Sequence, residues 1–304
     1  MDTRSFFDAI IVGGSYAGLS AGLTLGRSLR KTLILDGGNP CNKPSKAAHN
    51  LLTHDGQSPA RIREKAVEQV LAYPTVSIRN TSVTNVEGQD GAFFVETTGG
   101  DTFQAKKLLF ATGLEDILPA IRGFSDCWGK SILHCPYCHG YEVRGERTAI
   151  IASGIKAVHF TKLLHNWTND LVVISNGEAE IDPDHEKQMS EWGVPHLHEP
   201  IDAILSNGGQ LEGVRLQSGE VVVCTAAYAH LAFRQKSNLP ERIGCRLNDQ
   251  GILSVDDFQR TSVTGVFAAG DNSFPLRAIA SSLSTGMRAG AAINMDLIGG
   301  LLPG

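Results

Sequence analysis

The sequence lacks the features that mark two large classes of protein. No apolar run approaches the ~20 residues that a membrane-spanning helix needs. Cations are not in excess either, because 27 Lys and Arg stand against 32 Asp and Glu, for a formal net charge of -5. A nucleic-acid groove needs clustered cations that displace phosphate counterions. We therefore expect neither a membrane partner nor a nucleic-acid partner.

The sequence also has few cysteines and lacks the pattern of a signal peptide. Six cysteines in 304 residues are too few for the disulfide scaffold of a secreted protein. The first residues, Met1–Asp8, carry acids where a signal peptide carries a basic region followed by an apolar one. We therefore expect a cytoplasmic protein, in which a close cysteine pair is more often redox-active or metal-binding than structural.

Glycine is the one residue type in clear excess. The chain has 33 glycines in 304 residues, against a typical share of about 7%. Such a surplus usually marks tight turns and close approach of the backbone to a ligand. Apolar residues make up 42% of the chain, which excludes intrinsic disorder. The length allows two domains of about 100–200 residues each.

Two segments have the pattern of a strand, a glycine turn, a helix and a second strand. The first begins at residues 8–12, which are apolar after Asp8, turns at Gly13–Gly18 and ends at Asp36. The second covers residues 148–174 and turns at Ser153 and Gly154. Two such units predict parallel sheets with right-handed crossovers.

Further strands are expected between and after these units. Alternating patterns predict hairpins near residues 93–103 and 211–223, and a late strand stops at Gly270 and Asp271. We predict an α/β fold with two Rossmann-like, three-layer domains, and we expect the chain to change domain near residues 114–118 and 243–248.

The first glycine turn is the strongest signal for a cofactor. A helix N-terminus favours a dinucleotide pyrophosphate through its unbonded N–H groups and its dipole. Gly13 permits the tight turn and Gly18 close packing of helix on strand, although Ser15 replaces the usual middle glycine. Asp36 lies 18 residues after Gly18, where a carboxylate accepts hydrogen bonds from a ribose. The alternative is a glycine-rich turn that binds nothing.

The second glycine turn matches the dinucleotide-binding pattern less well than the first. Residues 152–157 lack the first glycine of the motif, and the next strand ends in Ser175-Asn176-Gly177. This end offers neither an acid for a ribose nor an arginine cluster for a 2′-phosphate. The recognition groups for NAD(P)H are therefore missing, and the alternative is a nucleotide fold retained as a scaffold.

The reactive centre is expected at residues 134–141, His-Cys-Pro-Tyr-Cys-His-Gly-Tyr. Cys135 and Cys138 are three positions apart and can close a small disulfide, while Pro136 favours a first helical turn. A helix N-terminus lowers the pKa of a thiol and so favours the thiolate that disulfide exchange needs. His139 follows directly and can move a proton at neutral pH. The pattern predicts a redox-active pair.

Three alternatives compete with that interpretation. Cys135, Cys138 and His139 also spell the attachment pattern of a c-type haem, which requires a secreted chain. A structural zinc site needs four ligands, and with no second CxxC and no paired-histidine motif we expect no metal. The third alternative is a pair of inert buried cysteines. Among the other histidines, His49 is of interest because it lies beside Asn50.

Taken together, these residues resemble the low-molecular-weight thioredoxin reductase family, FAD-dependent pyridine nucleotide-disulfide oxidoreductases of class II. The resemblance rests on Gly13–Gly18 with Asp36, on Ala111–Gly113, on Cys135–Cys138 and on Gly265–Asp271, in this order. It covers essentially the whole chain. It implies a non-covalent FAD held by the first and last thirds of the chain, a thioredoxin-like partner and a homodimer. It also implies two nucleotide-binding domains, the second inserted into the first. The FAD-binding domain is expected at residues 1–115 and 246–304, and the inserted NAD(P)-binding-like domain, which carries the CxxC pair, at 116–245.

The resemblance also implies roles for individual residues. Cys138 is expected to face the flavin, Cys135 to exchange with substrate and His139 to act in catalysis. The residues expected to bind FAD at its pyrophosphate, ribose, ribityl chain and flavin are Gly13, Gly14, Ser15, Ala17, Gly18, Asp36, Asn50, Val83, Ala111, Thr112, Gly113, Gly270, Asp271, Ala278 and Ile279.

Two departures from the family pattern bear on function. His139 stands where the family usually has an aspartate, as in a subgroup that includes oxidases of small dithiols. The degraded nicotinamide site resembles relatives that use ferredoxin or a second flavin as donor. We expect an FAD-dependent thiol–disulfide oxidoreductase of thioredoxin reductase type, with a donor other than NADPH. The alternatives are a dithiol oxidase that reduces oxygen and a non-catalytic flavin redox sensor.

Overall fold

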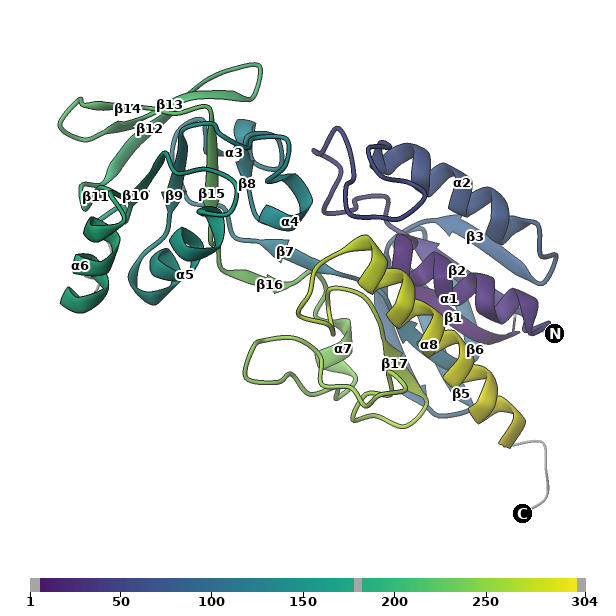
Figure 1. Cartoon of the computed structure of the whole chain (residues 1–304). Helices are drawn as coiled ribbons and strands as arrows, with labels where there is room; N and C mark the ends of the chain where they lie inside the picture. Colours follow the sequence, from purple (N-terminus) through teal and green to yellow (C-terminus); the bar gives the residue numbers. More distant parts are fainter. Residues whose placement is uncertain (1–5, 178–181, 300–304) are drawn as a thin grey trace. The chain divides into compact units, whose positions relative to one another are not determined.

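The chain folds into two compact units (Figure 1). This computed structural model describes residues 6–177 and 182–299, so the ends of the predicted first domain, 1–5 and 300–304, lie outside the described residues. The first unit comprises residues 1–43, 60–115 and 233–304, and the second comprises 44–59 and 116–232.

The first unit is built on a seven-stranded sheet of order β3-β2-β1-β6-β5-β4, with β17 also paired to β6. Strands β3, β2, β1, β6 and β17 are parallel, and β5 and β4 are antiparallel. The first half of β6 pairs with β5 and its last residues pair with β17. The strands are β1 (Phe6–Val12), β2 (Thr32–Asp36), β3 (Val76–Asn80), β4 (Val83–Gln89), β5 (Ala92–Thr97), β6 (Thr102–Phe110) and β17 (Val266–Ala268).

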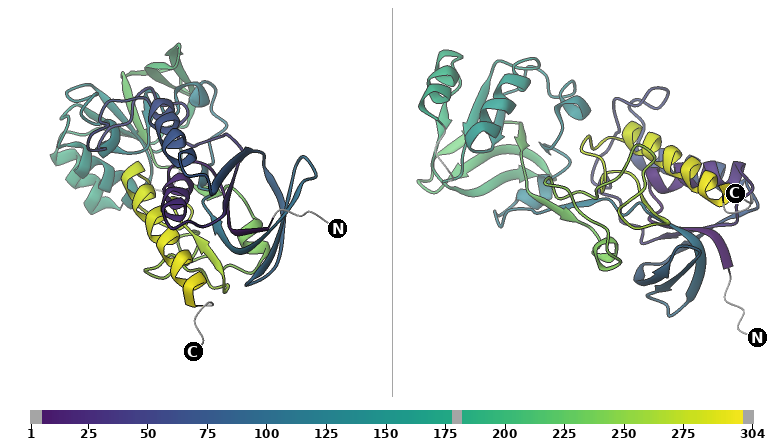
Figure 2. Two further views of the ribbon diagram at one scale, coloured as in Figure 1. Left: turned by 90° about the vertical axis from the view of Figure 1, so that its right-hand side faces the viewer. Right: turned by 90° about the horizontal axis from the view of Figure 1, so that it is seen from below.

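Helices cover this sheet because its central strands are apolar on both faces. All five residues of β2 are buried, which is typical of a parallel strand between two layers. The helices of the unit are α1 (Tyr16–Arg27), α2 (Pro59–Leu71), α7 (Leu239–Arg242) and α8 (Ile279–Gly299). Figure 2 shows α1 and α8, at the two ends of the colour scale, lying side by side.

Small residues let α1 and α8 approach closely. A Cβ atom added at Gly286 would lie 2.1 Å from the carbonyl oxygen of Ala17, and one at Gly290 would lie 2.9 Å from that of Ala21. Both glycines therefore lie where one helix touches the backbone of the other.

The second unit contains a five-stranded parallel sheet of order β11-β10-β9-β15-β8 and a three-stranded antiparallel sheet, β12-β13-β14. Two apolar clusters of buried residues form its core. Its strands are β8 (Ile132–Leu133), β9 (Thr148–Ile151), β10 (Leu171–Ile174), β11 (His196–Leu197), β12 (Ile201–Asn207), β13 (Gln210–Leu216), β14 (Val221–Val223) and β15 (Ala226–Ala229). Its helices are α3 (Phe124–Cys127), α4 (Pro136–His139), α5 (Gly154–Leu164) and α6 (Pro183–Glu191).

The predicted α/β fold with two Rossmann-like parallel sheets is confirmed. The chain passes between the units four times, at residues 43–44, 59–60, 115–116 and 232–233. At the last two passages β7 (Leu114–Asp116) pairs with β16 (Phe233–Gln235). Residues 44–59, expected in the first domain, cluster with the second unit, where Ser45 contacts His139. The last passage precedes the expected boundary at 245–246, because Leu239 and Cys245 are buried in a core cluster of the first unit.

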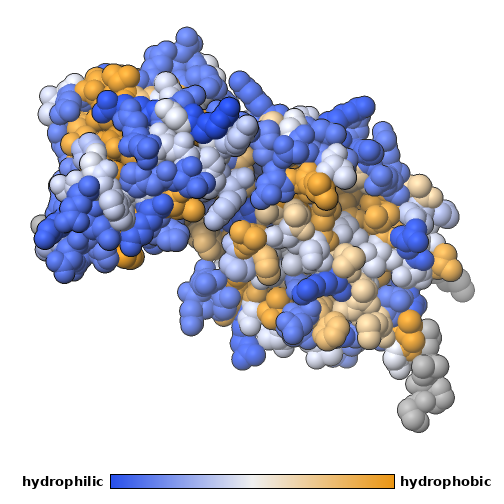
Figure 3. Space-filling view, viewed as in Figure 1, coloured by the Kyte–Doolittle hydropathy of each residue, from blue (hydrophilic) through white to orange (hydrophobic). Residues whose placement is uncertain are grey.

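The described helices do not include one that is long and apolar enough to cross a membrane. On the face drawn in Figure 3, hydrophilic residues predominate and hydrophobic ones form local groups. Val221 and Val223 of the edge strand β14 are among the exposed apolar residues, at 41% and 63% of their full area. Apolar exposure on this face is therefore local rather than a continuous belt.

Replacing Gly286 with alanine is expected to lower the free energy of unfolding by about 1–3 kcal/mol, because the new methyl group would push α1 and α8 apart. Urea unfolding of the purified protein measures the change. Gly299→Ala is the matched control on the same helix, since a Cβ there meets no described atom within 4 Å. Equal losses for the two variants would contradict the packing argument.

Candidate functional site

Most of the predicted cofactor residues gather at one edge of the sheet in the first unit. Strands β1, β2, β6 and β17 are parallel and in register, so their carboxyl ends finish side by side. Asp36 ends β2, while Gly13–Gly18 follows β1, Ala111–Gly113 follows β6 and Gly270–Asp271 follows β17. Open α/β sheets bind ligands at this edge.

The glycine turn after β1 leaves a helix N-terminus ready for an anion. Gly13 has a φ of 112°, and a Cβ there would lie 2.2 Å from the carbonyl oxygen of Ala111. Ser15, the N-cap of α1, is extended, with a φ of -94°, which explains why serine can replace glycine. Among the described residues its side chain makes no capping bond. The N–H groups of the first turn therefore fit a pyrophosphate.

Asp36 is held rigidly beside this turn. Its Oδ1 accepts hydrogen bonds from the backbone N of Gly14 at 3.2 Å and of Gly38 at 3.1 Å. Arg63 of α2 pairs with the other carboxylate oxygen, and its Nε donates to the carbonyl oxygen of Gly14 at 3.2 Å. The aspartate side chain is 11% exposed. Arg63 is a residue of this site that no sequence motif marks.

Asp271 lies in a polar cluster after β17. Its Oδ1 accepts from the hydroxyl of Ser282 at 3.4 Å, and its Oδ2 lies 3.7 Å from Nε of Arg277. The Cys41 sulfur lies 3.8 Å from the same Oδ2. A carboxylate in this position suits the hydroxyl groups of a ribityl chain, as the family resemblance implies.

The neighbouring Asn272 has one unsatisfied atom. Its Nδ2 donates to the Phe110 carbonyl oxygen at 2.9 Å and to the Thr112 hydroxyl at 3.2 Å. Its Oδ1 is buried and has no hydrogen-bond partner among the described residues. Buried acceptors are normally paired, so this orphan fits a site that a hydrogen-bonding cofactor completes.

Two further predicted cofactor contacts, at the start of α8 and at Val83, also belong to the first unit. Helix α8 begins at Ile279, after Ala278, so the N–H groups of its first turn are available as donors. Val83 is the first residue of β4. Its neighbour Ser82 packs against Gly37, since a Cβ at Gly37 would lie 2.9 Å from the Ser82 hydroxyl. Val83 is thus close to the turn that follows Asp36.

Asn50 is the predicted cofactor residue that falls in the other unit. It belongs to the segment 44–59, which clusters with the second unit. It has a φ of 57°, and its backbone N donates to Oδ1 of Asp55 at 2.7 Å. Its role toward a flavin stays a prediction.

The dithiol lies at the carboxyl end of β8 in the second unit. The sulfur atoms of Cys135 and Cys138 are 2.7 Å apart. Cys135 is the N-cap of the short helix α4, and Pro136 occupies its first position. The helical turn expected from the proline is confirmed, and it brings both sulfur atoms to one end of the turn.

Tyr228 lies close to the dithiol. It belongs to β15, where it pairs with Leu133 of β8, and it is only 1% exposed. Its hydroxyl is buried without a hydrogen-bond partner among the described residues. Burial raises the pKa of Tyr228, and Cys135 and Cys138 raise it further. The phenol therefore stays protonated, and nothing in the sequence linked it to the motif.

A second histidine lies against His139. The Nε2 atom of His139 is 3.2 Å from the Ser45 hydroxyl, and its ring centroid is 6.4 Å from that of His49 in an edge-to-face contact. His49 lies 3.6 Å from Oε1 of Glu142 and 3.5 Å from Oδ2 of Asp55. The segment that carries Ser45 and His49 thus joins the dithiol motif in a polar network.

This environment keeps His139 neutral. Burial lowers the pKa of His139 below its usual value, and the charge of a protonated His49 lowers it further. The carboxylate of Glu142 has the opposite, smaller effect. Near neutral pH the His139 imidazole is therefore a proton acceptor rather than a cation.

The loop after β10 is bound to the rest of its own unit. The Asn176 Oδ1 accepts from the backbone N of Ile201 at 2.7 Å, and the Gly177 N–H donates to the His198 carbonyl oxygen at 2.8 Å. Residues 175–177 carry no charged side chain. The side chain that could reach a ribose is thus already engaged, and weak NAD(P)H recognition stays a prediction.

Comparison with known proteins gives consistent matches. The chain matches the pyridine nucleotide-disulphide oxidoreductase family over residues 7–292. It is 32% identical to thioredoxin reductase sirT of Leptosphaeria maculans, covering 97% of this chain and 95% of the relative. Thioredoxin reductase aclD of Aspergillus oryzae is 30% identical, with 96% of each chain covered. The crystal structure of the oxidoreductase from Agrobacterium tumefaciens matches with a TM-score of 0.90 at 33% identity, over 96% of this chain and 98% of that one.

The two neighbours of His139 are expected to move its pKa in opposite directions. His49→Gln removes a group that lowers the pKa of His139, so the pKa should rise. Glu142→Gln removes the group that raises it, so the pKa should fall. NMR titration of ring-labelled histidines measures both, with His139→Gln to assign the signal.

The control for this pair is His54→Gln, in the same segment as His49. The His54 ring contacts Gln57, with Nδ1 and Oε1 3.3 Å apart, so the pKa of His139 should not change. Shifts of the same sign for His49→Gln and Glu142→Gln would contradict the electrostatic account.

Proposed function

Because the chain belongs to the pyridine nucleotide-disulphide oxidoreductase family, we propose that it passes electrons between FAD and a thioredoxin-like disulfide through Cys135 and Cys138. The family implies FAD as cofactor and disulfide oxidoreductase chemistry. The observation that carries the proposal is the close pair of sulfur atoms at the end of β8, beside a neutral histidine.

The first unit offers the groups that an FAD molecule needs. The N-terminus of α1 would hold the pyrophosphate, Asp36 the adenosine ribose and Asp271 the ribityl chain. When bound, the flavin supplies a carrier that takes up and releases an electron pair. Cys138 is proposed as the thiol that faces it.

The dithiol then reacts by disulfide exchange. The Cys135–Cys138 disulfide accepts an electron pair, and its S–S bond opens to two thiolates. The Cys135 thiolate attacks the partner's disulfide and forms a mixed disulfide, releasing one partner sulfur. The Cys138 thiolate then attacks Cys135, which restores the internal disulfide and releases the second partner sulfur. Two electrons and two protons reach the partner.

His139 is proposed to move the protons. As a neutral base it accepts a proton from a thiol and returns it to a sulfur that leaves the partner. The Ser45 hydroxyl, 3.2 Å from Nε2, holds the ring in one orientation. His49 and the exposed Glu142 offer a route for protons to solvent.

The donor is proposed to be other than NADPH. The loop after β10 presents no charge at residues 175–177, and Asn176 is engaged with Ile201. Ferredoxin or a second flavin as donor would not require a loop that recognises a nicotinamide nucleotide. A homodimer is the assembly that we propose from the family resemblance. The cytoplasm is the location that we propose from the sequence.

A dithiol oxidase is the second candidate. His139 is a neutral base, suited to deprotonating an incoming thiol, and a dithiol donor requires no nicotinamide site. The side chains of Tyr137 and Tyr141 are 61% and 66% exposed beside the dithiol, which suits contact with a small organic substrate. The substrate would lose two electrons and two protons to form its disulfide, and oxygen would be reduced to hydrogen peroxide. A flavin redox sensor without turnover is the remaining alternative.

Cys138→Ser is expected to lower disulfide exchange at least about 100-fold, because the flavin can no longer reduce the pair. The yellow colour of bound FAD should survive. The control is Cys224→Ala in the same unit, a thiol whose pKa burial raises to about 11 and which therefore stays protonated. Unchanged turnover in Cys138→Ser would refute the proposed route.

Anaerobic titration of the flavin absorbance distinguishes the donors. We expect slow, weak bleaching by NADPH, because its recognition groups are missing. Reduced ferredoxin should bleach the flavin in a reductase, and a small dithiol should do so in an oxidase, where aerobic turnover also consumes oxygen. Rapid bleaching by micromolar NADPH would show that the second unit binds a nicotinamide after all.

A further inference from the structure

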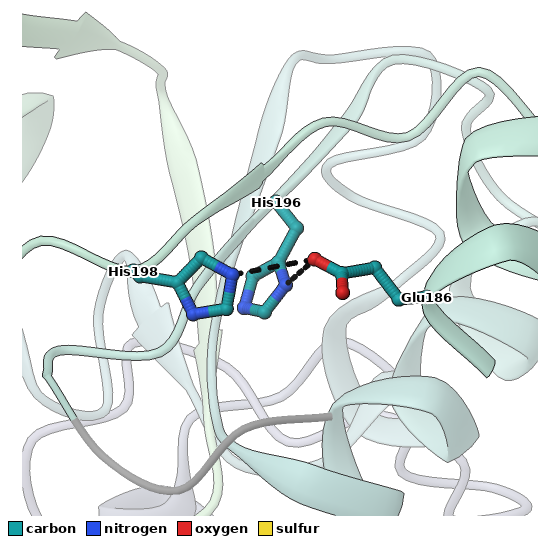
Figure 4. Close-up of side chains that lie close together, drawn as sticks. All are labelled: Glu186, His196 and His198. Atoms are coloured by element: carbon teal, nitrogen blue, oxygen red, sulfur yellow. Dashed lines mark hydrogen bonds and ion pairs between the residues drawn. The ribbon is translucent and has the colours of Figure 1, made fainter. Parts of the chain in front are cut away.

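Two histidines and a glutamate of the second unit converge away from the dithiol (Figure 4). Glu186 comes from α6, His196 lies in β11 and His198 follows that strand directly. The Oε1 atom of Glu186 is 3.2 Å from Nδ1 of His196 and 3.3 Å from Nε2 of His198. The ligand atoms that the three residues offer all lie within 4.8 Å of one another.

Regular secondary structure brings the three side chains together. His196 and His198 are two positions apart on an extended segment, so their side chains leave it on the same face. Their ring centroids are 3.8 Å apart. Helix α6 precedes β11, and Asp182 caps its start by accepting from the backbone N of Asp184 at 3.0 Å. The three side chains are therefore held in place by a strand and a capped helix.

The distances suit a metal ion. Zinc bonds to histidine nitrogen and carboxylate oxygen are about 2.0–2.2 Å long, which places neighbouring ligands of a tetrahedral site about 3.3–3.5 Å apart. The observed separations of 3.2 and 3.3 Å are close to that value. Two histidines and a glutamate also form a known ligand set for zinc with one position left open.

Burial of the three residues is uneven. The His196 side chain is only 4% exposed, and its Nε2 has no partner among the described residues. His198 and Glu186 are 49% and 46% exposed. One ligand is therefore fixed in the interior, while the other two border solvent and leave a path for an ion and its water.

We propose that Glu186, His196 and His198 bind a divalent transition metal of the zinc type, with at least one coordination position open to water. This differs from the sequence-based expectation of no metal. The two histidines have the spacing of a strand rather than that of a zinc finger, and the glutamate lies ten residues earlier in another element. The site does not depend on the proposed redox function.

Zinc titration of the untagged, FAD-loaded protein tests the site. The dithiol must first be oxidised, because reduced Cys135 and Cys138 also bind zinc. Calorimetry with Zn²⁺ alone is expected to show one ion per chain. His198→Ala and Glu186→Gln should each weaken binding at least about tenfold, since even outer-shell changes cost that much. His185→Ala, on the same helix but outside the cluster, should bind like the wild type.

Two further measurements keep the result unambiguous. Zinc-edge X-ray absorption should show only nitrogen and oxygen neighbours, at about 2.0–2.2 Å, whereas a neighbour at about 2.3 Å would be sulfur. Flavin absorbance and circular dichroism verify that each variant is folded. Absence of one-to-one binding, equal binding by wild type, His198→Ala and Glu186→Gln, or sulfur ligation would each overturn the proposal.

Discussion

The candidate cofactor site of the first unit depends on one close approach between two stretches of backbone. Gly13 lies so near the carbonyl of Ala111 that no side chain fits between them. This contact brings the turn after β1 against the end of β6. It also places the start of α1 at the carboxyl edge of the sheet. The same edge holds Thr112, to which Asn272 donates a hydrogen bond. A bulkier residue at position 13 would separate the groups that a dinucleotide must touch together.

A second close approach extends this arrangement to the end of the chain. Gly286 packs on the carbonyl of Ala17, so α8 is positioned by the first turn of α1. Both helices begin near the carboxyl edge of one sheet, and both therefore present N–H groups there. Gly13 and Gly286 are two of the 33 glycines, and at both a backbone carbonyl leaves no room for a side chain.

Much of the fold could be predicted from the sequence, because its signals are local. The two strand–turn–helix units and the proline-initiated turn of the dithiol each follow from neighbouring residues. The position of the last passage between the units was harder to predict. Its position depends on Leu239 and Cys245, which are buried in the first core, and their pattern does not reveal which core they join.

The parts of the site that sequence reasoning missed are contacts between distant segments. Arg63 reaches Asp36 from another helix, and Ser45 meets His139 across 94 positions of sequence. Tyr228 approaches the dithiol because β15 pairs with β8. Each partner is an ordinary polar residue with no motif around it. Only the strand order and the packing of the segment 44–59 bring these groups together.

In the second unit, one extended segment links the loop after β10 to the proposed metal site. In such a sheet the loop after the second strand normally faces a ribose, and here that loop is tied down through the carbonyl of His198. The same residue turns its imidazole toward Glu186. The segment that carries His198 thus accepts a hydrogen bond from the backbone of this loop and supplies one of the proposed metal ligands. A change at His198 would accordingly spare the loop, which is held by backbone, while removing the ligand.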